Sequence, residues 1–327
     1  MTDAASTLAA MRASVAREAA EPERVARTSA QQIGESLTGL GLAAEDVEEA
    51  SAHWRDLASR SEWCDLLAGV LAQVQRQQGQ PDEPVAIWDD LDGAGDLGRL
   101  FYLYVAALSA GWTATYLGRS GFPSEVIAQS LGTLARHVRV HRDKRGTLGV
   151  DAGWWILLML RGDLVTVGAL QYHRVNLGRG TLSPQPWYDE RAAADLGAGF
   201  RAGDASVGLH IPDGADLSAR SVACSLAAAR DLLDRCWPVS QRRLVTCQSW
   251  MLDERLGDWL DATSNLVRFG ALFTLVPGWL EGDEDVREFV FRPRASGPST
   301  LQGVVAGLFE RGEHWHVRTG WLAWERR

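Results

Sequence analysis

Lysine is almost absent from this sequence: of its 33 basic residues only Lys144 is a lysine, and the 42 acidic residues outnumber the basic ones. The formal net charge is −9 at pH 7. A surplus of negative charge disfavours nucleic acids and acidic membrane surfaces, which bind proteins through basic patches. We therefore expect neither nucleic acid nor a membrane among the partners.

Cysteine pairs and long hydrophobic runs are also missing. The sequence has no C-x-x-C pair, which favours buried free thiols in a reducing compartment. The N-terminus has no apolar stretch of signal-peptide length. The most apolar run, 153–165, is broken by Arg161 and Asp163 after about nine residues, short of the ~20 that a membrane span requires. These absences predict a cytoplasmic protein. The four cysteines are Cys64, Cys224, Cys236 and Cys247.

The common nucleotide-binding and hydrolase motifs are absent as well. There is no G-x-S-x-G, G-x-x-x-x-G-K-[ST] or G-x-G-x-x-G, which removes the commonest hydrolase, NTPase and dinucleotide-binding interpretations. His137 and His141 have the spacing of a metal pair on a helix, but no acidic residue lies one turn away on that face. His314 and His316 are interpreted as solvated residues of an edge strand. We expect no metal site.

Length and periodicity predict two domains. A chain of 327 residues exceeds one typical domain. Residues 1–155 show helical spacing of apolar residues, although the Ala-rich stretch 1–30 is expected to fray. Residues 156–327 alternate between strand and helix patterns, with helices at 218–236 and 253–262 and a sheet of about six strands. The fourteen tryptophans are interpreted mainly as core residues. The strand candidates are 163–178, 205–212, 242–252, 270–278, 287–293 and 313–325.

One segment, residues 207–233, combines a strand, an abrupt loop and an amphipathic helix. The strand ends at His210, Pro212 to Gly214 break the chain, and Ser218 is a natural N-cap for the helix. The first N–H groups of a helix have no backbone partner, so such a junction suits a phosphate group. His210 lies at the carboxyl end of its strand, where open α/β sheets bind ligands. A buried structural histidine is the alternative interpretation.

The next strand ends in a similar way. Cys247 and Ser249 are predicted on one side of it, and Gln248 and Trp250 on the other. A further helix begins near Ser264-Asn265. Small polar side chains at the ends of adjacent strands are what a substrate cleft between those strands would need.

Three segments of the second half together resemble the C-terminal domain of bacterial acyltransferase-domain proteins with a GNAT-like fold. A His-Ile-Pro-x-Gly loop, a Ser-Trp-x-Leu segment and a Ser-Asn-x-x-x-Phe segment recur in that family in this order. Here they occupy residues 210–214, 249–252 and 264–269. Upstream, 121–138 and 164–172 are similar to the helical N-terminal domain and the junction strand of the same proteins. The resemblance covers roughly residues 40–324.

The resemblance implies an α+β fold: a helical N-terminal domain over 1–155, then a GNAT-like mixed-sheet domain over 156–327. The central parallel strands of that sheet splay apart around an acyl thioester, which is acetyl-CoA or another acyl-CoA acting as substrate. The pyrophosphate of coenzyme A is expected on the backbone amides of the loop and of the helix start. The implied binding residues are Ile211, Asp213, Gly214, Ser218, Ala219 and Arg220.

The loop departs from the usual GNAT pattern. That pattern is Gln/Arg-x-x-Gly-x-Gly/Ala, whereas this loop reads IPDGADLSAR. Asp213 and Asp216 would repel a pyrophosphate unless they point outward, and Arg220 offsets them only in part.

We predict direct transfer of the acyl group to an amine or hydroxyl of a small-molecule acceptor. His210 is the predicted base, Ser249 a proton donor and Asn265 a positioning group. Cys247 as a covalent nucleophile would need an activating cation, and none is apparent nearby in the sequence.

Two alternatives to this enzyme remain open. The altered loop favours a non-catalytic GNAT-like binding or regulatory module. An enzyme acting on acyl chains held by an acidic carrier protein would need a basic docking surface, for which Arg242-Arg243 is the candidate. Each interpretation is compatible with a homo-oligomer.

Overall fold

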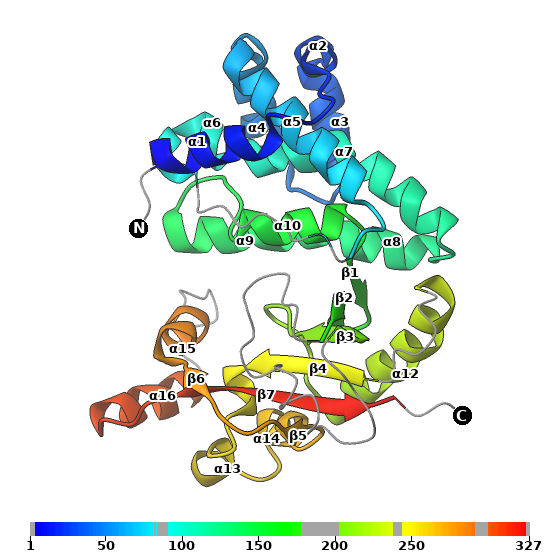
Figure 1. The fold of residues 1–327 in the computed structure, drawn as a ribbon. Coiled ribbons are helices and arrows are strands. Elements are labelled where there is room, and N and C mark those ends of the chain that lie inside the picture. Colours follow the sequence, from blue (N-terminus) through cyan, green and yellow to red (C-terminus); the bar gives the residue numbers. More distant parts are fainter. Residues whose placement is uncertain are drawn as a thin grey trace. The chain divides into compact units, whose positions relative to one another are not determined.

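The structure, a computed structural model, describes residues 4–81, 83, 91–177, 203–237, 244–291 and 300–324. The chain separates into two compact units, Met1–Val165 and Thr166–Arg327. Each unit is described by itself below, with the element labels of Figure 1.

The first unit is helical as far as Leu160 (Figure 1). Its apolar positions recur at three- and four-residue spacing, which buries one stripe of each helix. Several helices have recognisable starts: Ser29 and Gln32 form a capping box at α3, and Glu45 and Asp46 lie in the first turn of α4. The elements are α1 (Ala4–Val15), α2 (Pro22–Arg27), α3 (Ala30–Gly39), α4 (Ala44–Ala58), α5 (Ser61–Gln77), η1 (Asp92–Ala94), α6 (Asp96–Arg99), α7 (Phe101–Arg119), α8 (Ser124–Leu131), α9 (Thr133–Arg145) and α10 (Gly153–Leu160).

One stretch of this unit, Asp96–Arg119, is long and apolar enough to cross a membrane by length and composition alone. Its most apolar window is 61% buried inside the protein. The stretch contains α7, which has buried residues on nearly every side and serves as a central core helix.

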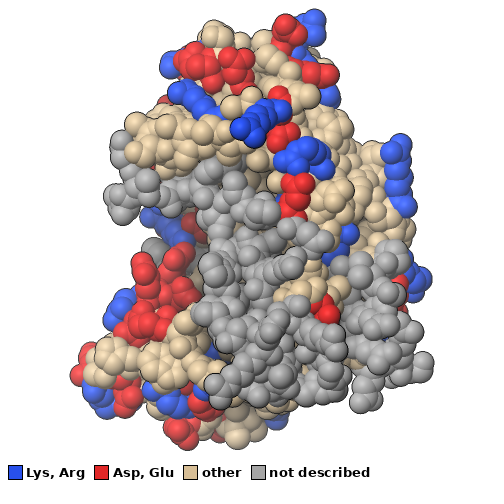
Figure 2. Space-filling view, viewed as in Figure 1, with Lys and Arg blue, Asp and Glu red and all other residues tan. Residues whose placement is uncertain are grey.

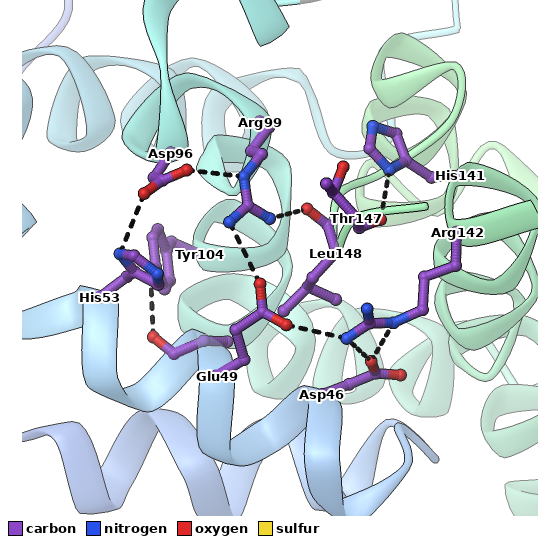
Figure 3. Close-up of polar contacts among 11 residues, drawn as sticks. Asp46, Glu49, His53, Asp96, Arg99, Tyr104, His141, Arg142, Thr147 and Leu148 are labelled. Carbon is purple, nitrogen blue, oxygen red and sulfur yellow. Dashed lines mark hydrogen bonds and ion pairs between the residues drawn. The ribbon is translucent and has the colours of Figure 1, made fainter. Parts of the chain in front are cut away.

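A network of charged side chains ties α4, α6 and α9 together (Figure 3). Arg142 on α9 donates to Asp46 at 2.6 Å and to Glu49 at 2.9 Å, both on α4. Glu49 also accepts from Arg99 at 3.1 Å. His141, one residue before Arg142, is fully buried and has acceptors at both ring nitrogens. Because several charged groups share partners in one network, these contacts hold the helices together more effectively than an isolated surface pair would.

The second unit contains a mixed sheet of seven strands within the described residues, in the order β1-β2-β3-β4-β7-β5, with β6 also paired to β7 (Figure 1). β2 and β3 are antiparallel, β3 and β4 are parallel, and β4 and β7 are antiparallel. The predicted α+β class, with a helical first part and a mixed sheet in the second, is confirmed. The strands are β1 (Leu164–Val167), β2 (Leu170–Asn176), β3 (Ala205–His210), β4 (Leu244–Ser249), β5 (Thr274–Leu275), β6 (Leu280–Glu281) and β7 (His316–Ala323).

The longest helix of this unit, α12, connects β3 to β4 and packs on the sheet. Ser225 in its middle donates to the carbonyl of Val167 and, with its single hydrogen used there, accepts from the Tyr172 hydroxyl at 2.8 Å. Gly168 follows Val167 with a φ of +63°, and a Cβ there would lie 3.2 Å from Cβ of Ser225. The helices are α12 (Ala219–Cys236), η3 (Trp250–Leu252), α13 (Leu256–Trp259), α14 (Asn265–Gly270), α15 (Asp283–Val290) and α16 (Thr300–Glu310).

Some expectations about this unit were wrong. The segment 163–178 is two strands joined by a turn at Gly168 rather than one strand. The strand predicted at 287–293 is instead the end of α15 as far as Val290, because three acidic residues open a helix there and Val286 and Val290 bury one helical face. Cys224 is exposed on α12, and Trp279 is exposed rather than a core residue.

Candidate functional site

The parallel strands β3 and β4 pair over only a short length. Two residue pairs join them, Val207 with Val245 and Gly208 with Thr246. β3 then continues to His210 and β4 to Ser249 without further pairing between them in the described residues. Unpaired edges between parallel strands leave backbone groups that a bound molecule can meet. The opening lies at the carboxyl ends of both strands, where sheets of this kind bind ligands.

His210 borders this opening together with a second imidazole that the sequence analysis missed. His173 on β2 pairs with Gly208, so its ring lies on the same face as His210, and the ring centroids are 5.6 Å apart. His173 is only 2% exposed. A Cβ at Gly208 would lie 3.4 Å from Nε2 of His210 and 3.5 Å from Cβ of His173, so glycine keeps this space clear. Only the strand register, which the sequence does not reveal, brings the two rings together.

The pKa of His210 is lowered to about 4 because the protein removes its ring from water. Its Nε2 is buried, although part of the side chain reaches the surface. The imidazole is therefore neutral at pH 7, the form that accepts a proton.

Residue alternation decides which side chains share the face of His210. Because Gly208 pairs with Thr246, this face also carries Thr246 and Gln248 of β4. Ser249 lies on the opposite face, with Leu209 and Cys247. The register thus places His210 and Ser249 at the same end of the sheet but on different faces.

The loop after His210 is a tight turn. The N–H of Ala215 donates to the carbonyl of Pro212 at 3.0 Å, and Gly214 has a φ of +73°. A positive φ at this position of a turn favours glycine strongly. Asp213 and Gly214 are exposed, and Ile211 is partly buried.

Asp216 is held against the start of α12 and does not extend freely. Its carboxylate accepts from the Ser218 N–H at 2.9 Å and from the Ser218 hydroxyl at 3.0 Å. These hydrogen bonds lower the pKa of Asp216, so it is ionised. The Ser218 hydroxyl in turn caps the N–H of Ser221 at 3.3 Å.

These bonds leave the N–H groups of Ala219 and Arg220 at the open start of the helix. The first turn of α12 contains no acidic residue, and both residues are exposed. Two helical N–H groups, the helix dipole and one guanidinium form a suitable environment for a phosphate. Asp216, close by, limits how much negative charge this end of the helix attracts.

Ser249 lies at the end of β4, and Asn265 lies at the start of α14. Ser249 closes β4, and its oxygen accepts from the Met251 N–H at 3.1 Å, which leaves its own hydrogen available to donate. Asn265 is exposed at the first position of α14, which packs on η3 and α12. The structure gives no contact between Asn265 and His210.

The structure also defines the surroundings of three other side chains that the sequence analysis considered. Cys247 is buried, and burial raises the pKa of its thiol to about 12, which opposes a thiolate nucleophile. His137 bonds the Asp151 carbonyl at 2.7 Å, and His141 the Thr147 carbonyl at 2.9 Å. The basic pair Arg242-Arg243 lies outside the described residues.

Comparison with known proteins places this geometry in context. Residues 31–162 match the family model of the N-acyltransferase N-terminal domain, and residues 164–322 match that of the GNAT-like C-terminal domain. No match is found among curated proteins.

Solved structures of acyltransferases resemble the whole chain. One, in complex with decanoyl-CoA, is 28% identical over 88% of this chain and 86% of its own, with a TM-score of 0.73. Another, with CoA and 10C-teicoplanin, is 28% identical over the same shares, with a TM-score of 0.72. A third, with decanoyl-CoA and teicoplanin, is 26% identical over 98% of this chain and 99% of its own, with a TM-score of 0.78. The chain thus belongs to the acyltransferases that join an N-acyltransferase N-terminal domain to a GNAT-like C-terminal domain.

Proposed function

We propose that this protein transfers the acyl group of an acyl-CoA to an amine or hydroxyl of a small-molecule acceptor. The observation that carries the proposal is the early separation of β3 from β4 beside the open start of α12. Such an opening accommodates a thioester between the strands while the helix start holds the pyrophosphate. Acyl-CoA as substrate is consistent with the acyl-CoA complexes of the similar acyltransferases.

His210 is the proposed general base. The acceptor nitrogen or oxygen attacks the thioester carbonyl carbon and gives its proton to the neutral imidazole. The carbon–sulfur bond then breaks, and coenzyme A leaves as a thiolate. The thiolate takes a proton from the Ser249 hydroxyl, and the imidazolium returns its proton through solvent to the serine. A thioester between separated strands could reach His210 on one face and Ser249 on the other.

The coenzyme A contacts are proposed on the loop and the start of α12. Ala219 and Arg220 would supply N–H groups, and the Arg220 guanidinium a positive charge. The turn at Ile211, Asp213 and Gly214 would bring the backbone close to the pyrophosphate. Ser218 caps the helix start between these two groups, and Asn265 would orient the acceptor.

Acidic side chains gather over α15 in Figure 2, where the exposed residues Glu284, Asp285 and Glu288 lie. A surface of that sign repels an acidic acyl carrier protein. The surface over α15 therefore does not provide the basic docking site that a carrier-bound acyl chain would need.

Calorimetric titration with decanoyl-CoA, followed by mass spectrometry of the products with a panel of amines and alcohols, tests the proposal. We expect saturable binding and release of free coenzyme A that depends on the acceptor. Binding without any acceptor-dependent release would support a non-catalytic module. No binding at millimolar ligand would contradict both interpretations.

A further inference from the structure

An exposed tryptophan, Trp279, is held flat against a histidine beyond the end of β4. The Trp279 side chain is 57% exposed, an unusual state for so large an apolar group. Its indole stacks on the imidazole of His316 with ring centroids 3.9 Å apart and an interplanar angle of 10°. One face of the indole is therefore covered, and the exposed surface belongs mainly to the other.

A bulge in the edge strand presents this indole. Val276 donates its N–H to the Thr319 carbonyl at 2.8 Å, and Leu280 pairs with Val317. The three residues between them, 277–279, therefore lie opposite Arg318 alone. Gly278 has a φ of +91°, which allows the sharp turn. Bulges of this kind redirect a side chain and are over-represented beside active sites.

The backbone beneath Trp279 is anchored at His316. The backbone N–H of His316 donates to the carboxylate of Asp253 at 3.0 Å, and Asp253 is 2% exposed. Arg255 binds the same carboxylate through two nitrogens, at 2.9 and 2.6 Å. The backbone that carries His316 therefore has a fixed position, and the indole stacks on the imidazole that it presents.

The pair lies at the end of the sheet where the proposed chemistry occurs. Ser249 pairs with Arg318 on β7, and His316 precedes Arg318 by two residues on an antiparallel strand. His316 thus lies just beyond the carboxyl end of β4, on the face of Ser249. In Figure 1 the β4 arrowhead ends near β6 and the start of β7.

We infer that Trp279 and His316 form a subsite that stacks an aromatic ring of the acceptor. The inference rests on the proposed function, because it assigns this surface to the acceptor of that reaction. A flat indole fixed on one side and open on the other offers the geometry of offset aromatic stacking. Because His210 lies on the other face of the sheet, the acceptor class implied is an amine or alcohol whose aromatic ring is far enough from its nucleophile to reach past the end of β4 to that face.

Saturation-transfer NMR with phenylethylamine and cyclohexylethylamine tests the subsite, since the two amines share the same chain and the bulkier, more hydrophobic cyclohexyl ring lacks planarity and π-electrons. We expect stronger transfer to the phenyl protons in the wild-type protein. Trp279→Ala should weaken phenylethylamine binding about 3- to 10-fold, toward the level of the cyclohexyl compound, and Trp279→Phe should retain part of the preference. Phe291→Ala, which removes another exposed aromatic side chain, serves as the control and should bind like wild type.

Equal transfer to both amines in the wild type, or an unchanged phenyl preference in Trp279→Ala, would overturn the subsite. Calorimetry with decanoyl-CoA on the same proteins separates this result from the proposed function. We expect wild-type affinity for decanoyl-CoA in Trp279→Ala. A wild-type protein that binds phenylethylamine selectively but not decanoyl-CoA would contradict the proposed function and leave the ring-binding subsite supported.

Discussion

At the scale of single residues, burial determines which side chains can perform chemistry. Removal from water keeps the Cys247 thiol protonated, which opposes a thiolate nucleophile. The same effect keeps the His210 imidazole unprotonated at neutral pH, and its pKa of about 4 also makes it a weaker base than an ordinary histidine. A general base must accept a proton at working pH, and a neutral imidazole does so while a thiol cannot. This contrast favours direct transfer over a covalent acyl-enzyme.

Replacing His210 with alanine should lower the rate of acyl transfer by roughly 10²- to 10⁴-fold, because that is the range of general-base contributions. The variant should keep its melting temperature and its affinity for decanoyl-CoA. His314→Ala, at an exposed histidine, is the control and should keep full activity. A large fall in melting temperature with normal turnover per folded molecule would show that His210 is structural.

The pH profile offers a second test of the same residue. Because the pKa of His210 is lowered to about 4, the base stays unprotonated from neutral pH down to that value. With a hydroxyl acceptor, whose own protonation does not change in this range, we expect kcat/KM to hold between pH 7 and about pH 5 and to fall as the pH approaches 4. A fall centred near pH 6.5, the ordinary histidine value, would contradict the assignment.

The pKa of His141 in the first unit is raised, whereas that of His210 is lowered. Burial alone would lower its pKa, but hydrogen bonds with Asp92 at 3.3 Å and with the Thr147 carbonyl at 2.9 Å outweigh burial and raise it. Both partners accept hydrogens, and this arrangement favours the imidazolium form of the ring. Its contribution to stability is complete below the unfolded pKa near 6.5 and is lost as pH rises through the raised folded pKa.

We therefore expect the melting temperature to fall across the range above pH 6.5, and His141→Gln to flatten that dependence. Circular dichroism at a series of pH values measures both. His53→Gln, at a partly exposed histidine on α4, is the matched control and should leave the slope unchanged. An equal slope in wild type and His141→Gln would show that other groups cause it.

At the scale of elements, the sequence predicted the features that depend on neighbouring residues, but it did not predict the register of the strands. The Ser218 cap, the break at Gly214 and the apolar stripe of α12 follow from neighbouring residues, and the structure has each of them. The proximity of His173 to His210 depends on which strands pair, so no pattern within either segment could show it. The helix α15 was missed because Phe289-Val290-Phe291 favours a strand locally, while the acidic turn before it and packing of Val286 favour the helix.

The loop can be tested by comparing two glycines. Gly214 and Gly312 both have positive φ, +73° and +76°, and a Cβ at either would meet no atom within 4 Å. Valine at either site should therefore cost a similar amount of stability, about 1–2 kcal/mol, from backbone strain alone. Only Gly214→Val should also weaken decanoyl-CoA binding, by calorimetry, since Gly312 follows α16 and lies outside the proposed site. Equal affinities in the two variants would move the cofactor site elsewhere.

At the scale of the whole molecule, the predicted combination of a helical domain and a GNAT-like domain is confirmed, as is the membership of an acyltransferase family. The sequence supported both because three short motifs occur in a set order over a long span. Several motifs in a set order over a long span constrain the fold more strongly than any single motif does. The order of the motifs did not reveal which side chains lie next to each other on neighbouring strands.

The net charge of the molecule opposes the charge of its proposed substrate. Coenzyme A is a polyanion, and the protein carries a formal charge of −9. At low salt the repulsion acts over a Debye length of about 30 Å, and at physiological salt over about 8 Å. The few favourable groups at the start of α12 act only at short range.

We therefore expect the association rate constant for decanoyl-CoA to rise as ionic strength increases from about 0.01 M to 0.15 M, because salt screens the long-range repulsion first. Stopped-flow measurement with the protein gives this rate constant. Decanoyl-pantetheine, which lacks the phosphates, is the control and should associate at a rate that salt hardly changes. A decanoyl-CoA rate that falls with salt would mean that a local positive field steers the substrate. In that case the basic surface at the site outweighs the charge of the whole molecule, and substrate capture is set by the site's own residues.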